Sequence, residues 1–502
     1  MRLEIPGSEF IVNVGTKKQL FLDNYIIETT RWISPRLSET ARWIQPPARD
    51  RTELDGWKEG TDRITEDVPG HLVRATVFVT RTINQPKRFE GNPIMVRAYS
   101  WEGESAPWPV RIMYDKEEKL WKMWYNGLTH QETPVRRHLY RCMYATSENG
   151  IIWERPRMGL VKDEVGNDTN ICYEGKGQYV LKDRDTEPSR RYKMVQSIRD
   201  KEGLQHPMVH YSPDGLHWTP ELGPFSHNRG DENLSVMYDP ASQKYIGFCR
   251  NVYPKPVLVH RTERSIHRMQ SNDLVHWSMC TPIIDKDDLD ALDIDFEGMW
   301  GMYYENMYLG FLRVSHTARN QMDCWLAHSR DGFHWQRPRT APFFTWGHQG
   351  RWDSKSVTVI QPPEQVGDEL WIFYTGVDDQ NAALGLAKLR VDGFASIDAC
   401  PNDRPEKNNP PTLMTKPLYS SGNRLVVNVE ASKGSIEAEL LNTEGFVMEG
   451  YSRIDCDLFM GDSLAHTFTW KGNANIGGYL PLRIRFYMQN SRLYSLQIPE
   501  VL

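Results

Sequence analysis

The stretch Ser329-Arg-Asp-Gly-Phe-His-Trp335 recurs three times earlier in the chain, as Ser147-Glu-Asn-Gly-Ile-Ile-Trp153, Ser212-Pro-Asp-Gly-Leu-His-Trp218 and Ser271-Asn-Asp-Leu-Val-His-Trp277. The four tryptophans are separated by 65, 59 and 58 residues. In each copy Asp or Asn, followed in three copies by Gly, favours a tight turn, and the Trp begins the next strand. Four such turns at a regular spacing indicate a repeat architecture.

Short runs rich in β-branched and aromatic residues lie between these turns, and Gly, Asp, Asn and Pro interrupt them. The runs are Val110–Tyr114, Leu120–Tyr125, Arg191–Gln196, Leu234–Tyr238, Tyr245–Cys249, Met299–Tyr304, Tyr308–Leu312, Val357–Ile360 and Leu370–Tyr374. Repeats of this length with four strands each are typical of β-propeller blades. A fifth unit, Lys355–Phe394, ends in a degenerate form of the turn, Val391-Asp-Gly-Phe394. The sequence therefore predicts an all-β fold with a five-bladed β-propeller.

The segments on either side of the repeats have different patterns. Residues 401–417 contain five prolines and are predicted to form a linker. Beyond them, four runs alternate apolar and polar residues as half-buried strands do: Arg424–Ala431, Ser435–Asn442, Ala465–Trp470 and Leu482–Met488. We expect an N-terminal extension over residues 1–90 packed on the propeller, the propeller over 91–400, a Pro-rich linker over 401–417 and a β-sandwich over 418–502.

Charge and composition disfavour several classes of partner. Sixty Lys and Arg against 66 Asp and Glu give a net charge of −6, which disfavours non-specific nucleic-acid binding. No uncharged apolar run approaches the length of a membrane helix, so no membrane partner is expected. The first ten residues lack a signal-peptide pattern, which favours a cytoplasmic protein, or a secreted or periplasmic one whose signal has been removed. The seven cysteines are odd in number and include no CxxC, which favours reduced thiols.

The repeats and the segments around them resemble a known group of enzymes. The likeness rests on the four turns, on Asn92-Pro93 leading to Trp101-Glu102, on Met113-Tyr-Asp115 followed by Lys122-Met-Trp-Tyr125, and on Arg191-Tyr-Lys193. Over residues 90–395 the chain resembles the five-bladed β-propeller glycoside hydrolases, which include arabinanases, xylosidases, invertases and levansucrases. It is most similar to a branch that opens with Gln-Leu-Phe-Leu-Asp-x-Tyr, here Gln19 to Tyr25. The invertase signature Trp-x-Asn-Asp-Pro-Asn-Gly is absent, so the resemblance implies no fructan specificity.

Hydrolysis of a glycosidic bond usually needs two carboxyl groups, one protonated to assist the leaving oxygen and one ionised to activate water or attack the sugar. In a propeller, the innermost strand of each blade lines the central channel. The predicted inner strands end at Asp115, Asp239, Glu305 and Gln361, and the positions eight residues earlier are Pro107, Asp231, Glu297 and Asp353. Three of these four positions would bring carboxylates to the channel from different blades.

The family resemblance implies roles for these carboxylates. Glu297 is expected to be the general acid, and Asp231 and Asp353 the base or nucleophile and an electrostatic modulator, in either order. Asp295 and Glu102 are the substitutes, and Asp295 would face the same side of a strand as Glu297, two residues away. The structural alternative is that each is an acidic turn residue at a strand entrance, which is a common feature.

Candidate substrate-binding residues follow from the same geometry. The second strand of a blade returns to the channel mouth, where it ends in Arg250, Arg313 or Asn126. An Arg there can hold sugar hydroxyls or a substrate carboxylate, or it can form a structural ion pair between blades. Sugar rings stack on indoles, which makes Trp108, Trp300 and Trp352 candidates, although most of the 17 tryptophans must be core residues. His316 is a candidate for binding a central ion or a hydroxyl.

The leading functional prediction is a glycoside hydrolase that acts on a plant or microbial oligosaccharide or polysaccharide. One alternative is an intracellular glycoside phosphorylase, which would bind phosphate through Arg, Lys and His. Another is a non-catalytic carbohydrate-binding propeller, which Pro107 in the first blade favours. No cofactor and no metal ligand set are expected, although a structural or central-channel cation such as calcium is compatible with the fold. The sequence predicts no oligomeric state.

Overall fold

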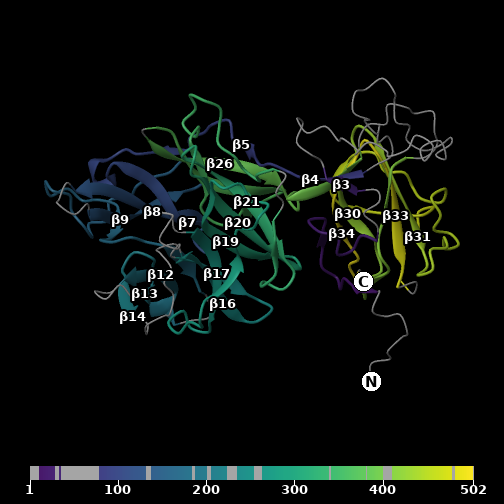
Figure 1. The fold of residues 1–502 in the computed structure, drawn as a ribbon, viewed down its shortest axis with the longest axis horizontal. Coiled ribbons are helices and arrows are strands. Elements are labelled where there is room, and N and C mark those ends of the chain that lie inside the picture. The colour runs from purple at the N-terminus through teal and green to yellow at the C-terminus, as the bar shows by residue number, and fades with distance from the viewer. Residues whose placement is uncertain are drawn as a thin grey trace. The chain divides into compact units, whose positions relative to one another are not determined.

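The computed structural model describes residues 11–28, 33–35, 79–131, 137–183, 187–199, 205–222, 234–253, 263–337, 341–379, 381–399, 410–477 and 481–500. The chain divides into two compact units, one formed by Gln85–Leu389 and the other by Met1–Asn84 with Arg390–Leu502 (Figure 1). Both units consist of β-strands, which confirms the predicted all-β class. Within the described residues, the helical elements are two single 3-10 turns, η2 (Ser100–Glu102) and η3 (Pro188–Arg190).

The unit Gln85–Leu389 begins with three antiparallel sheets of four strands each, in which consecutive strands pair. The first contains β7 (Ser105–Asp115), β8 (Leu120–Gln131), β9 (Arg137–Ser147) and β10 (Ile171–Tyr173). The second contains β11 (Tyr179–Lys182), β12 (Tyr192–Arg199), β13 (Gln205–Ser212) and β14 (Thr219–Leu222). The third contains β15 (Leu234–Asp239), β16 (Lys244–Tyr253), β17 (Glu263–Ser271) and β18 (Thr281–Ile284).

The remaining strands of this unit form two groups that a single parallel pair, Met322 with Ser356, joins into one sheet. The first group contains β19 (Ile294–Tyr304), β20 (Met307–His316), β21 (Gln321–Ser329) and β22 (Trp335–Gln336). The second contains β23 (Ser356–Val359), β24 (Glu364–Val366), β25 (Glu369–Val377) and β26 (Ala382–Arg390). The early strands β5 (Lys87–Arg88) and β6 (Met95–Val96) pair with β26, so both ends of the unit share one group. We interpret the five groups as the five blades.

Hydrogen bonds between neighbouring groups repeat along the chain. A Tyr near the start of a second strand donates to an Asp at the end of the preceding group's first strand, in the pairs Tyr192–Asp115, Tyr245–Asp183 and Tyr308–Asp239, at 3.0, 2.8 and 3.0 Å. Gln361, after β23, donates to the backbone oxygen of Ile112 in β7 at 2.7 Å and accepts from its backbone nitrogen at 2.6 Å. Since Gln361 lies in the last group and Ile112 in the first, these bonds close the ring of sheets.

The four repeated turns are held by the same local hydrogen bonds. The Ser hydroxyl accepts from the backbone nitrogen three residues later at 2.8–2.9 Å in all four copies. That later residue has a positive φ, +72° at Gly150, +81° at Gly215 and +75° at Gly332. Leu274 adopts the same conformation at +69° with its side chain fully buried, so burial compensates for the cost of a left-handed residue other than Gly.

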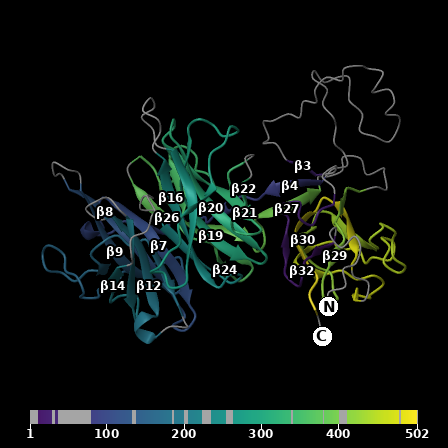
Figure 2. The ribbon, with the colours of Figure 1, turned by 60° about the horizontal axis from the view of Figure 1, so that its bottom comes forward.

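The second unit contains two main sheets that share one apolar core. The larger sheet contains β2 (Gln19–Leu20), β3 (Ile33–Pro35), β4 (Val79–Ile83), β27 (Ala395–Ala399), β30 (Val426–Glu430), β32 (Asp462–Thr467) and β34 (Arg492–Gln497), several of which are labelled in Figure 2. The smaller contains β28 (Thr412–Met414), β31 (Ser435–Leu441) and β33 (Arg483–Gln489), and β1 (Val12–Asn13) pairs separately with β29 (Leu418–Tyr419). We interpret the two sheets as the predicted sandwich.

The division of the chain differs from the predicted domains at both ends of the propeller. β2 pairs with β34 and β4 pairs with β27, so the described part of the N-terminal extension belongs to the C-terminal unit. Phe21, Ile26 and Ile27 are buried in the core of that unit, which is the physical reason for the assignment. The propeller ends at Leu389, before the predicted fifth turn, and residues 401–409 of the predicted linker lie outside the described residues.

Candidate functional site

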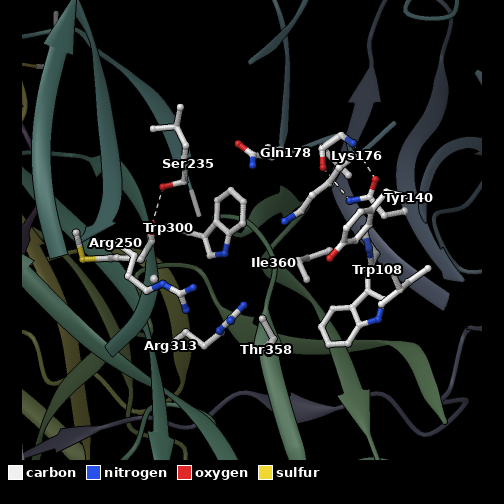
Figure 3. Close-up of a pocket in the computed structure, with 18 residues that line it drawn as sticks. Trp108, Tyr140, Lys176, Gln178, Ser235, Arg250, Trp300, Arg313, Thr358 and Ile360 are labelled. Carbon is white, nitrogen blue, oxygen red and sulfur yellow. Dashed lines mark hydrogen bonds between the residues drawn. The ribbon is translucent and has the colours of Figure 1, made fainter. Parts of the chain in front are cut away.

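A cavity of about 380 Å³ lies where first strands of the Gln85–Leu389 unit converge (Figure 3). This volume is in the range of small-molecule sites. Four of the five strand groups contribute strand residues to the wall, and the segment just before β11 and Ile360 just after β23 contribute the rest of it. The lining residues are Trp108, Pro109, Val110, Asn126, Leu128, Tyr140, Lys176, Gly177, Gln178, Leu234, Ser235, Arg250, Gly298, Met299, Trp300, Arg313, Thr358 and Ile360. Five of the seven predicted substrate-binding residues are among them.

Aromatic side chains contribute apolar faces to the cavity. Trp108 on β7 and Trp300 on β19 come from different groups and are both partly exposed (Figure 3). The Trp300 ring stacks on the Tyr179 ring with centroids 5.9 Å apart and planes 27° apart, which fixes its orientation. The ammonium of Lys176 lies over the ring of Tyr140, 5.0 Å from its centroid. Such faces suit the C–H face of a sugar ring.

Two arginines of the wall share one carboxylate. Arg250 on β16 donates to Oε2 of Glu297, and Nη2 of Arg313 on β20 lies 3.6 Å from the same oxygen. The other oxygen, Oε1, accepts from Arg264, which lies on β17. Glu297 and Arg250 are each 7% exposed, so this is a buried ion-pair network. Figure 3 shows both lining guanidinium groups in the same part of the cavity.

Glu297 occupies an irregularity in β19. Phe296 pairs with Val314 and Gly298 pairs with Arg313, so Glu297 is an extra residue in the strand. Bulges of this kind redirect a side chain, and here the carboxylate meets the arginines while Gly298 lines the cavity. Asp295 lies nearby, where it accepts from the backbone nitrogen of Arg264 at 3.0 Å. Burial raises the pKa of Asp295, and that hydrogen bond opposes the rise.

Two further predicted catalytic residues, Glu102 and Asp353, are absent from the cavity lining, as are Glu297 and Asp295. Glu102 is fully buried and accepts from Tyr125 at 2.7 Å, from Arg155 at 2.8 Å and from two backbone nitrogens. Asp353 is also fully buried and accepts from Arg88 at 2.6 Å and Tyr374 at 3.2 Å. These contacts are those of structural carboxylates. Asp231 lies outside the described residues, so its predicted role stays a prediction.

Asn126 lines the cavity, but its amide is engaged with the backbone. Its nitrogen donates to the oxygen of Gly177 at 2.8 Å, and its oxygen accepts from the nitrogen of Gly177 at 2.9 Å. This pair of bonds holds the segment that presents Lys176 and Gln178 to the cavity. Asn126 is therefore placed to position the wall, in addition to the predicted contact with substrate.

Two predicted binding residues lie away from the cavity wall. Trp352 stacks on Tyr374, with ring centroids 5.6 Å apart. His316 at the end of β20 lies 3.2 Å from Oδ2 of Asp323 and meets the ring of Trp346 edge-on. Burial raises the pKa of Asp323, and the contact with His316 opposes this rise.

Sequence reasoning missed Lys176, Gln178, Tyr140 and Arg264. The first two precede β11, in the strand group for which the count along the predicted inner strands names no position, and a Gly-Lys-Gly-Gln stretch, Gly175–Gln178, was the available signal. Among the described residues, no group of three or more His, Cys, Asp or Glu is arranged to hold a metal ion. The described residues also include no helix long and apolar enough to cross a membrane.

Comparisons with known proteins give structural likenesses only. No family model matches the chain, and no curated protein matches it. A glycosyl hydrolase from Bacteroides ovatus is 14% identical, with a TM-score of 0.45, over 62% of this chain and 94% of that one. A member of the mannoside phosphorylase family whose hydrolases target β-1,2 mannosidic linkages in Candida mannan is 13% identical, with a TM-score of 0.42, over 62% and 94%.

A fructofuranosidase variant from Schwanniomyces occidentalis, complexed with fructosylnystose, is 12% identical with a TM-score of 0.41 and covers 82% of this chain and 97% of that one. The solved structures similar to this chain thus include glycoside hydrolases, as the sequence resemblance implies. These three identities are below 25% and these three TM-scores are below 0.5, so the likenesses establish no activity for this chain.

Proposed function

We propose that the protein is a carbohydrate-active enzyme that binds a saccharide in this cavity and hydrolyses its glycosidic bond. The observation that carries the proposal is the convergence of Trp108, Trp300, Arg250 and Arg313 on one cavity from three strand groups. Indole faces bind the apolar face of a sugar ring, while guanidinium groups bind its oxygens. A cavity that combines these two kinds of group offers a saccharide both stacking faces and hydrogen-bond donors.

The proposal gives the buried carboxylates different roles from those that the resemblance implies. Glu297 is assigned the role of anchor for Arg250 and Arg313, because both of its carboxylate oxygens already contact guanidinium groups. Asp295 contacts the same network and is a better candidate for a protonated acid, since burial raises its pKa. Asp231 stays a proposed catalytic carboxylate on the sequence pattern alone.

A second candidate function is glycoside phosphorolysis. It is favoured by one observation, the presence of Lys176, Arg250 and Arg313 in the lining, because cationic side chains of this kind bind phosphate oxygens. A non-catalytic carbohydrate-binding protein would need only the aromatic and cationic wall. The three functions differ in whether a bond is broken and whether phosphate is consumed.

The test is product release from arabinans, xylans, fructans, pectic polysaccharides and aryl glycosides, each with and without inorganic phosphate. Wild type is compared with Trp300→Ala and with Phe333→Ala, which removes an exposed aromatic ring outside the lining. We expect phosphate-independent release that Trp300→Ala reduces and Phe333→Ala leaves unchanged. Release that requires phosphate would favour the phosphorylase, and binding without release would favour the binding protein. If no saccharide is bound or cleaved, the proposed function is wrong.

A further inference from the structure

The indole of Trp300 depends on another strand group for part of its support. Trp300 lies on β19 and is partly exposed in the cavity, where Figure 3 shows its ring among the lining side chains. Residues two apart share one face of a strand, and the residue two before Trp300 is Gly298, which contributes no side chain to that face. The indole packs against a cluster of buried residues to which Tyr179 on β11 belongs.

Tyr179 is the aromatic residue of that cluster on which the indole stacks. The two ring centroids are 5.9 Å apart and the ring planes are 27° apart. Because β11 belongs to the second strand group and β19 to the fourth, the stack joins two groups that do not follow each other in the chain. Tyr179 is itself 8% exposed, and its backbone pairs with Val195 on β12. The indole therefore rests on a ring that is buried in an ordered strand.

The segment that leads to Tyr179 is fixed at the cavity wall. Gly177 lies two residues before Tyr179, and its backbone nitrogen and oxygen both bond the side-chain amide of Asn126, at 2.9 and 2.8 Å. A Cβ atom at Gly177 would lie 2.9 Å from Sγ of Cys142 and 3.2 Å from Cγ2 of Val110, so this backbone packs closely against the first strand group. These contacts define the position from which the Tyr179 side chain projects.

We propose that Tyr179 is a positioning residue, which holds the indole of Trp300 with one face toward the cavity. Tyr179 is absent from the lining, so it acts on a bound saccharide through Trp300. Two stacked rings restrict each other to a few relative orientations, and a side chain that is already restricted loses less freedom when a ligand binds. This inference rests on the proposed function, because it names a residue that prepares the stacking face of the same cavity.

The test is a double-mutant cycle between Tyr179 and Trp300, made from Tyr179→Leu, Trp300→Ala and the double variant. Tyr179→Phe keeps the ring, and Tyr179→Met replaces Tyr179→Leu if the leucine variant does not fold. Tyr211→Leu is the matched control, because Tyr211 is also 8% exposed, belongs to the same cluster and is absent from the lining. Calorimetry gives the Kd of the most tightly bound saccharide of the panel, initial rates give its KM and kcat, and melting temperatures check folding.

We expect Tyr179→Leu to raise Kd and KM about two- to tenfold, which is the range that one aromatic pair contributes to an equilibrium constant. The change in kcat should be smaller. Tyr179→Phe should keep the wild-type Kd, and Tyr211→Leu should lower the melting temperature without changing Kd. In the Trp300→Ala background, Tyr179→Leu should have no further effect on Kd, because the partner of the stack is already absent.

Three results would overturn the inference and leave the proposed function standing. The first is an unchanged Kd in Tyr179→Leu. The second is an equal rise in Kd with and without the Trp300 indole, since Tyr179 would then act on the wall independently of that ring. The third is a rise in Kd in Tyr179→Phe as large as that in Tyr179→Leu, since the hydroxyl would then be the active group. If no saccharide binds to the wild-type protein, the proposed function fails together with the inference.

Discussion

Replacing Glu297 by glutamine separates two roles for this carboxyl group, proton donor and anchor of the arginines. The side chains of Glu297 and Arg250 are both buried, and removing one partner of a buried ion pair costs about 3–5 kcal/mol. The amide oxygen still accepts one hydrogen bond, so we expect a loss of about 3 kcal/mol, the lower end of that range. At about 2–4 °C per kcal/mol for domains of 150–250 residues, the melting temperature should fall by roughly 6–12 °C.

The kinetic effect follows from the loss of the anchor. Arg250 and Arg313 would lose their shared acceptor, so their guanidinium groups would bind substrate in less defined positions. We expect the KM for the cleaved saccharide to rise about tenfold, which corresponds to the free energy of one charge-assisted hydrogen bond. The change in kcat should be smaller than the change in KM. The shape of the pH profile of kcat should stay the same, because the proton donor is another group.

The assay combines thermal unfolding, followed by circular dichroism, with kcat and KM measured between pH 4 and pH 9. Glu364→Gln is the matched control, since it removes the ion pair with Arg111 and lies outside the cavity lining. The control should change the melting temperature without changing KM. A fall in kcat of about a hundredfold or more for Glu297→Gln, with an unchanged melting temperature and a lost limb of the pH profile, is what a general acid would give. That result would refute the role as anchor.

The remaining predictions concern stability. Gln361→Ala should lower the free energy of unfolding by roughly 2–6 kcal/mol in urea titrations, because both backbone groups of Ile112 lose a buried partner, at about 1–3 kcal/mol each; a loss below about 0.5 kcal/mol would contradict the ring closure. Gly332→Ala should cost about 1–2 kcal/mol by the same assay, since its φ is +75°, and an unchanged midpoint would argue against that conformation. Asp214 and Asp273 each have a pKa lowered to about 2, because hydrogen bonds from the following His residues and backbone nitrogens outweigh burial. Ionised, these two carboxylates stabilise the fold fully at pH values above their unfolded-state pKa of about 3.9, and the stabilisation is lost as the pH falls toward 2. The melting temperature should therefore fall between pH 6 and pH 2.5. The fall should be less steep in Asp214→Asn.

The propeller turns could be predicted from sequence because their stabilising contacts are local. The Ser hydroxyl accepts a hydrogen bond from a backbone nitrogen three residues away. The residues that stabilise each turn are therefore the same residues that form the sequence motif. The domain division could not be predicted in the same way. Gln19 pairs with Leu496, and nothing in the short strand around Gln19 specifies a partner so far along the chain. Long-range pairing of short strands leaves little signal in either segment.

The site was predictable only in part, for a related reason. Counting residues along the second strand of each predicted blade identified Arg250 and Arg313 as wall residues. This worked because β16 and β20 pair with their next strands without a register shift. Counting eight residues back along the first strands assumes that these strands also pair without a register shift. However, β19 has a register shift at Glu297, and β7 has two. In β19 the extra residue, Glu297, directs its side chain into the ion-pair network with the arginines instead of into the cavity. Pattern counting therefore found the binding wall better than the carboxylates.

The most direct test of the central claim is to locate the bound saccharide. Crystals of the wild-type protein would be soaked with an oligosaccharide from the substrate that releases the most product in the saccharide panel. We expect density for a sugar ring in the cavity, against Trp300, with its oxygens within hydrogen-bond distance of Arg250 and Arg313. A saccharide bound only elsewhere on the protein, with the cavity occupied by water, would contradict it.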